Sequence, residues 1–181
     1  MIMTAGVRKL ALSIHLVASL GWVGAVVAYL ALGISAVTAA DAQTVGAAWI
    51  AMERIGWSVI VPLALGALLT GVVLSLGTRW GLFRYYWVVT TLVLTILSTA
   101  VLLLHMPTVS ALAEVAREAE AAQPIQLGGD LLHAGLGLVV LLVITVLNIY
   151  KPQGMTRYGW RKQQERRAAG GPLDGPGQAP T

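Results

Sequence analysis

The 181-residue sequence contains no cysteine and very few charged residues. Without cysteine the chain forms no disulfide and offers no thiolate to a metal ion, an iron–sulfur cluster or a covalent reaction. Charged residues make up 11% of the sequence, whereas soluble domains carry about 25%. These absences leave histidine and carboxylate as the side chains best suited to chemistry.

Apolar residues take the place of the missing charges: they make up 57% of the sequence, and the mean hydropathy is +0.77. A helix crosses a ~30 Å hydrocarbon core in about 20 residues. Four apolar stretches are long enough, at about 10–38, 56–77, 85–106 and 131–150. In lipid the backbone must satisfy its own hydrogen bonds, which favours helices. We therefore expect an all-α integral membrane protein, with a four-helix up-down-up-down bundle over 1–150 and a basic, then disordered, cytoplasmic tail over 151–181.

The first apolar stretch has a competing interpretation as a signal peptide, because Arg8 and Lys9 precede it and a small-residue segment ends it at 36–39. Signal peptides have an apolar region of about 7–15 residues, and this run is about twice that length. The length favours an uncleaved helix.

The basic residues predict the orientation. Ten of the twelve Lys and Arg residues lie before the first stretch, between the second and third, or after the fourth. They are Arg8, Lys9, Arg79, Arg84, Lys151, Arg157, Arg161, Lys162, Arg166 and Arg167. Since cytoplasmic loops are rich in Lys and Arg, we expect a multi-pass protein of the bacterial plasma membrane with both termini in the cytoplasm.

The net charge is +4, and the basic residues flank apolar segments or lie in the tail. This distribution favours anionic lipid headgroups over nucleic acid as the partner. Other expected partners are a second copy of the chain or a membrane redox protein. The longest outer connection, about 107–130, places Val109, Leu112 and Ala116 at helical spacing. This spacing predicts a surface helix over 108–122, with a solvated connector as the alternative.

Three histidines lie within the apolar stretches, where polar side chains are costly and often functional. Counting roughly 1.5 Å per residue, His15 lies about 10 Å from the inner end of its helix. His105 and His133 lie roughly 25–30 Å from theirs, near the outer surface. These two can therefore share one ligand, whereas His15 is about 15 Å too deep. Trp22 and Tyr29 share a helix face with His15, and we interpret that stripe as packing.

The leading hypothesis is a b-type haem held between two imidazoles, for electron transfer or haem handling. His105 and His133 are its proposed axial ligands, and His15 is a further candidate. Arg54 and Arg117, the two outer arginines, would pair with the haem propionates.

The alternative is a metal-ion carrier or sensor with ligands His105, His133, Asp130 and Glu53. Imidazole and carboxylate suit zinc or copper(II), and Met106 could supply sulfur to a cuprous ion. A third hypothesis is a structural membrane subunit whose histidines only hydrogen-bond between helices. No Ser–His–carboxylate or paired-carboxylate arrangement appears within the apolar stretches, so hydrolysis is not predicted and enzymatic activity stays open.

His15, followed by Trp22-Val23-Gly24, resembles the first helix of copper-resistance membrane protein D and of the haem-binding membrane protoporphyrinogen oxidases. The resemblance implies a haem or copper ligand at His15, although Ala25 stands where the copper proteins often have a second glycine. The segments 69–71, 81–87 and 150–152 are similar to a family of small bacterial membrane proteins with no assigned function. That likeness covers most of the chain and implies four helices.

Overall fold

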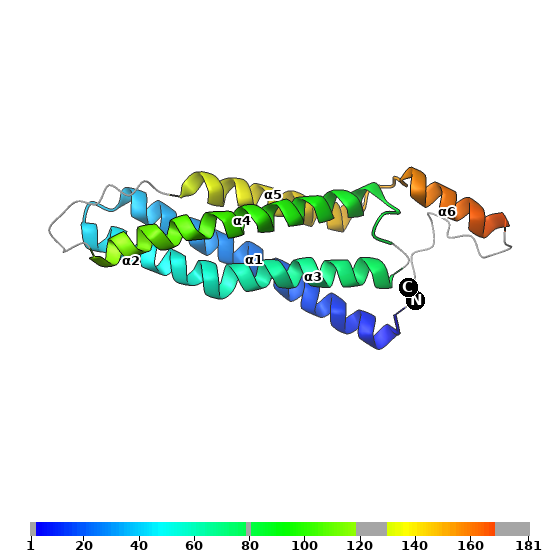
Figure 1. The fold of residues 1–181 in the computed structure, drawn as a ribbon, viewed down its shortest axis with the longest axis horizontal. Helices are drawn as coiled ribbons and strands as arrows, with labels where there is room; N and C mark the ends of the chain where they lie inside the picture. The colour runs from blue at the N-terminus through cyan, green and yellow to red at the C-terminus, as the bar shows by residue number, and fades with distance from the viewer. Residues whose placement is uncertain (1–2, 79–80, 119–129, 169–181) are drawn as a thin grey trace.

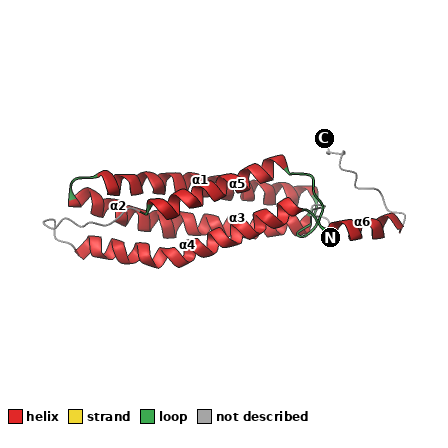
Figure 2. Ribbon diagram, turned by 90° about the horizontal axis from the view of Figure 1, so that it is seen from above, coloured by secondary structure: helices red, strands yellow, loops and turns green. Residues whose placement is uncertain are grey.

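The computed structural model describes residues 3–78, 81–118 and 130–168, and most of them are helical (Figure 1). The elements are α1 (Ala5–Thr38), α2 (Ala42–Ile55), the π-helical turn η1 (Gly56–Ile60), α3 (Val61–Gly77), α4 (Tyr86–Glu118), α5 (Leu131–Tyr150) and α6 (Arg157–Ala168). No β-strand occurs in these ranges (Figure 2). The prediction of an all-α chain is confirmed.

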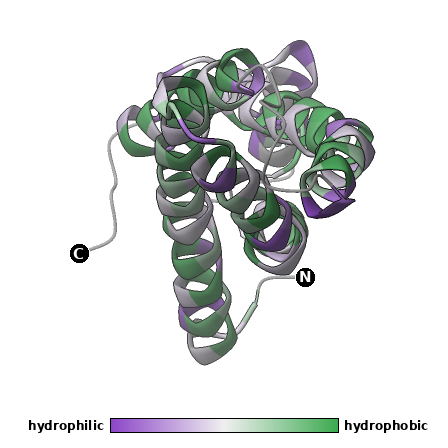
Figure 3. Ribbon diagram, turned by 90° about the vertical axis from the view of Figure 1, so that its left-hand side faces the viewer, coloured by the Kyte–Doolittle hydropathy of each residue, from purple (hydrophilic) through white to green (hydrophobic). Residues whose placement is uncertain are grey.

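Four helical segments are long and apolar enough to cross a membrane: Ala5–Thr38, Ala42–Gly77, Tyr86–Glu118 and Leu131–Tyr150. Many large apolar side chains on their outward faces are exposed, among them Val17, Leu69 and Leu104. A view along the bundle shows hydrophobic residues on outward as well as inward faces (Figure 3). Helices that are apolar all round are typical of a lipid environment.

The second segment begins at Ala42, well before the expected start at 56. Asp41 caps it, because its side chain accepts a hydrogen bond from the backbone N–H of Thr44 at 2.7 Å. The helix then passes through η1, where the N–H of Val61 bonds to the carbonyl of Gly56 five residues earlier. Pro62 lacks an N–H and its ring crowds the preceding turn, so the wider π-turn relieves the conflict.

The third segment continues past the expected end at 106 and runs through Pro107 to Glu118. The expected separate surface helix over 108–122 is therefore wrong, since 108–118 belong to α4; residues 119–122 lie outside the described ranges. Val109 and Ala113 are fully buried, and Trp57 Nε1 donates to Ser110 Oγ at 3.0 Å. Packing against the preceding helical segment thus stabilises this extension.

The end of the bundle next to α6 is joined by backbone hydrogen bonds. The N–H of Met3 donates to Gly77 O at 3.2 Å, and the N–H of Tyr86 donates to Gly154 O at 3.1 Å. Beyond them, α6 extends away from the long helices (Figure 2). The basic part of the expected tail is therefore helical over 157–168, and the part expected to be disordered, which follows Arg167, lies outside the described residues from 169 onward.

Candidate metal site

Two histidines and one aspartate converge near the start of α5. Asp130 Oδ2 lies 2.7 Å from His105 Nε2, and Asp130 Oδ1 lies 3.2 Å from His133 Nδ1. The two imidazole rings stack with centroids 4.1 Å apart and planes 17° from parallel. One potential ligand atom from each of the three residues lies within 4.8 Å of the others. Within the described ranges, this is the one group of three such residues that could hold a metal ion.

The helices explain why these residues meet. His105 comes from α4, whereas Asp130 immediately precedes α5 and His133 follows three residues later. Residues three apart on a helix are neighbours, so Asp130 and His133 face the same way. A carboxylate is also favoured at a helix N-terminus by the helix dipole.

The three side chains differ in their access to solvent. The Asp130 side chain is 6% exposed, that of His105 is 20% exposed, and that of His133 is 53% exposed. A buried carboxylate is costly unless charges or hydrogen bonds compensate it. Asp130 therefore depends on its partners, while the half-exposed His133 offers a route for an ion to enter.

Tyr29 of α1 completes the surroundings of Asp130, because its hydroxyl donates to Asp130 Oδ2 at 3.0 Å. The sequence interpretation of Tyr29 as a packing residue missed this role. The signal was available: Tyr29 lies fourteen residues after His15, which places it about 21 Å further along the helix. That is the depth at which His105 and His133 were expected.

The ligand set suits a small divalent ion. Zinc takes imidazole and carboxylate ligands at about 2.0–2.2 Å, which places them about 3.3 Å apart around a tetrahedron. Atoms within 4.8 Å of one another reach that arrangement with shifts of about an ångström. Two histidines and one carboxylate would leave a fourth position open, as catalytic and transport sites require. Tyr29 would act as an outer partner that orients the carboxylate.

The same geometry does not fit a haem between His105 and His133. Axial imidazoles lie on opposite faces of the porphyrin, with the iron between them. Here the two rings stack directly on each other, which leaves no room for a macrocycle, and Asp130 bridges their nitrogen atoms. The arrangement favours an ion over haem.

The outer arginines and Glu53 lie elsewhere. Glu53 pairs with Arg117, and Arg117 Nη1 also donates to Glu114 Oε2 at 2.7 Å. Glu53 is therefore engaged outside the cluster rather than serving as its fourth ligand. Arg54 follows it on α2 and is exposed. Arg117 is committed to two carboxylates, which weakens its expected role as a propionate partner.

His15 and Met106 also lie apart from the cluster. His15 Nδ1 lies 2.9 Å from Thr70 Oγ1, and the Thr70 hydroxyl in turn donates to Gly66 O at 2.5 Å. This is an interhelical hydrogen bond between α1 and α3. Met106 is 1% exposed, and its sulfur and methyl group pack beside Gly56. The expected roles as a metal or haem ligand gain no support from these positions.

Comparison with protein-family models, curated proteins and solved structures found no match to this chain.

Proposed function

We propose that the protein is a four-pass, up-down-up-down membrane protein that binds a divalent metal ion, of the zinc or copper(II) class, at its outer end. Four apolar helices with apolar outward faces support the membrane assignment. The ten-to-two distribution of basic residues supports cytoplasmic termini. In this orientation the His105–Asp130–His133 cluster lies on the extracytoplasmic side, where it would serve a metal carrier or sensor.

One observation carries the metal proposal: the buried Asp130 carboxylate contacts a nitrogen atom of each of two imidazoles that come from different helices. Metal ions bind neutral imidazole and ionised carboxylate, so an ion would take the place of the contacts that these groups now make with one another. The exposed edge of His133 gives the ion a path from the aqueous side. This access favours an ion that binds and is released over an ion that is permanently buried.

A structural role is the second candidate, because Tyr29, His105 and Asp130 already satisfy one another without an ion. Interhelical hydrogen bonds of this kind stabilise membrane bundles by themselves. In that case the cluster would hold α1, α4 and α5 together and bind no metal.

Titration of purified protein with metal separates the two candidates. The detergent-solubilised chain would be stripped with a chelator and titrated with Zn²⁺ or Cu²⁺ by calorimetry, with elemental analysis of the product. We expect one ion per chain, and a loss of affinity of about 100-fold or more in His105→Ala and Asp130→Asn. His15→Ala removes a membrane histidine outside the cluster and should bind normally.

Absence of stoichiometric binding, or an equal loss in His15→Ala, would favour the structural role. An absorption spectrum of the protein from haem-replete cells provides a further check. A Soret band that disappears in His105→Ala would overturn the preference for an ion over haem.

A further inference from the structure

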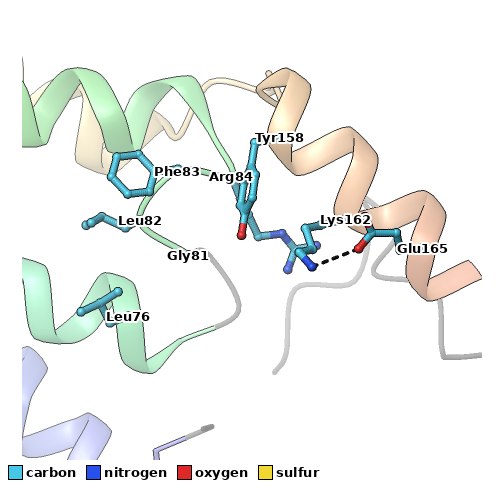
Figure 4. A pocket seen from close by; sticks show the side chains of 8 residues that line it. All are labelled: Leu76, Gly81, Leu82, Phe83, Arg84, Tyr158, Lys162 and Glu165. Atoms are coloured by element: carbon cyan, nitrogen blue, oxygen red, sulfur yellow. Dashed lines mark hydrogen bonds and ion pairs between the residues drawn. The ribbon is translucent and has the colours of Figure 1, made fainter.

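A pocket lies at the opposite end of the molecule from the histidine cluster, between the end of α3, residues 81–84 and α6. Its volume is about 550 Å³. Figure 4 shows the side chains that line it. Leu76, Leu82 and Phe83 form an apolar wall, while Arg84, Tyr158 and Lys162 supply polar groups. The pocket is therefore divided between an apolar side and a cationic side.

Hydrogen bonds around Thr156 hold the cationic side in place. The Thr156 hydroxyl donates to Phe83 O at 2.5 Å, and the Thr156 N–H donates to Arg84 O at 3.0 Å. The same hydroxyl accepts from the N–H of Gly159 at 3.1 Å, which caps the first turn of α6. Gly159 stands directly against the backbone carbonyl of Arg84, where any side chain would collide. These contacts fix Lys162 of α6 opposite Arg84.

The charges of the pocket favour an anion. Arg84 is 8% exposed, and it brings a positively charged guanidinium to the lining. Lys162 Nζ lies 3.0 Å from Glu165 Oε2, the pair marked in Figure 4. Two cations therefore face one carboxylate within the lining.

The apolar wall indicates that the ligand has an apolar part as well as a negative charge. Leu76 belongs to the last turn of α3, and both it and Phe83 are exposed. The exposed rings of Tyr86 and Tyr150 lie at the same end of the long helices, at positions typical of a membrane–water interface. A ligand here would meet hydrocarbon on one side and cations on the other.

We propose that this pocket binds the phosphate headgroup of an anionic phospholipid from the cytoplasmic leaflet. Arg84 and Lys162 would bind the phosphate oxygens, since guanidinium and ammonium donors form strong hydrogen bonds to phosphate. Leu76, Leu82 and Phe83 would contact the glycerol and the first acyl carbons. Basic pockets at the cytoplasmic ends of membrane helices are suited to such lipids. The proposal rests on the proposed membrane crossing and is independent of the metal site.

Thermal unfolding of the full chain in neutral detergent tests the proposal. Added phosphatidylglycerol should raise Tm by roughly 5 °C or more once the lipid exceeds its Kd about 100-fold, while phosphatidylcholine should not. Lys162→Gln and Phe83→Ala should each lose at least half of that shift. Arg157→Gln removes one charge from the same helix outside the pocket and should keep it. All three variants should still bind one metal ion, which separates this site from the outer one.

Three outcomes would overturn the lipid site. Phosphatidylcholine could stabilise the protein equally, which would indicate a general effect of lipid. Inorganic phosphate alone could produce the full shift, which would indicate a soluble anion. Arg157→Gln could lose as much stabilisation as Lys162→Gln, which would indicate diffuse charge attraction.

Discussion

Asp130 holds the His105–Asp130–His133 cluster together because this one buried carboxylate contacts groups from three helices. Its Oδ2 atom accepts a hydrogen bond from the Tyr29 hydroxyl of α1 and lies beside His105 of α4. Its Oδ1 atom faces His133 of α5. The affinity for an ion bound to the carboxylate would therefore depend on the orientation that the Tyr29 hydrogen bond gives to Asp130.

Removing the Tyr29 hydroxyl should weaken metal binding without removing a ligand. Tyr29→Phe leaves the ring in place but deprives Asp130 of one hydrogen bond, so we expect affinity to fall about 10-fold to 100-fold. Tyr150→Phe, the same chemical change at an exposed position of α5, is the control. Calorimetric titration with Zn²⁺ provides the measurement, and equal affinities for the two variants would exclude an orienting role for Tyr29.

Met106 gives a prediction about stability rather than binding. The side chain is 1% exposed and packs beside Gly56 at η1, so Met106→Ala should cost about 2–5 kcal/mol of folding free energy. Leu104→Ala on the same helix removes a side chain that is 81% exposed and should change stability far less. Unfolding in a graded detergent series compares them, and similar losses would contradict the assignment of Met106 to the core.

The residues of the site were partly predictable from the sequence. The sequence predicted that His105 and His133 lie close together, because their helices are antiparallel and the two residues have a similar depth. The spacing of three residues also placed Asp130 beside His133. The hydrogen bond of Tyr29 to Asp130 was not predicted, because a tyrosine on an apolar stripe has the same sequence pattern whether it packs or donates a hydrogen bond. Glu53 lies before the helix that was expected to begin at 56, so the sequence did not define its orientation, and the pairing with Arg117 was not foreseen.

At the level of single elements, Asp41 controls the start of α2. The backbone N–H of Thr44 donates to its carboxylate and holds the pKa of Asp41 below its usual value. A lowered folded-state pKa means that the stabilisation is present above the usual pKa of Asp. It is lost as the pH falls through the lowered value.

Asp41→Ala should therefore lower Tm slightly at neutral pH, and the difference from the native chain should shrink in strong acid, where the protonated side chain keeps only a neutral acceptor. Asp41→Asn keeps an oxygen acceptor and should remove the pH dependence while retaining most of the cap. Thermal unfolding from pH 7 down to pH 2 measures both effects. A constant difference between Asp41→Ala and the native chain at all pH values would rule out the charge-dependent part of the cap.

The position of α6 depends on the absence of a side chain at Gly159. Because a Cβ there would meet the Arg84 carbonyl, Gly159→Ala should push α6 away from the connection before α4. At Gly154 a Cβ would make only ordinary contact with the Tyr86 ring, at 3.5 Å, so Gly154→Ala is the matched control. Limited trypsin digestion reports on α6, which is rich in Lys and Arg. We expect faster cleavage in Gly159→Ala, and equal rates would show that α6 tolerates the methyl group.

The four long apolar segments were predictable, and the fourth has the expected bounds, but the second and third are longer than predicted. Pro62 and Pro107 are usual signs of a helix end, and Glu53 with Arg54 breaks the apolar pattern of the second segment. In the structure, η1 accommodates the chain around Pro62, and burial of Val109 and Ala113 continues α4 beyond Pro107. Tertiary packing, which a single sequence does not display, overrides these local signals.

For the whole molecule, the lack of cysteine provides a direct test of orientation. Gln43→Cys, at the start of α2, and Gln153→Cys, in the connection before α6, each introduce a single exposed thiol. If the termini are cytoplasmic, a membrane-impermeant maleimide should label Gln43→Cys in intact cells. Gln153→Cys should react only after the cells are opened. The reverse pattern would place the histidine cluster on the cytoplasmic side.

Within α5 the buried side chains are Ala134 and Leu141, and the helix packs against α1 and α4. Tyr29, His105 and Asp130 link these same three helices. Since α5 is the last of the four apolar helices in the chain, these links form only after α5 has been synthesised. An ion bound at the proposed site would add ligand bonds from His105 and His133, and its release would leave the hydrogen bonds of Asp130 to Tyr29 and His105 to hold the three helices.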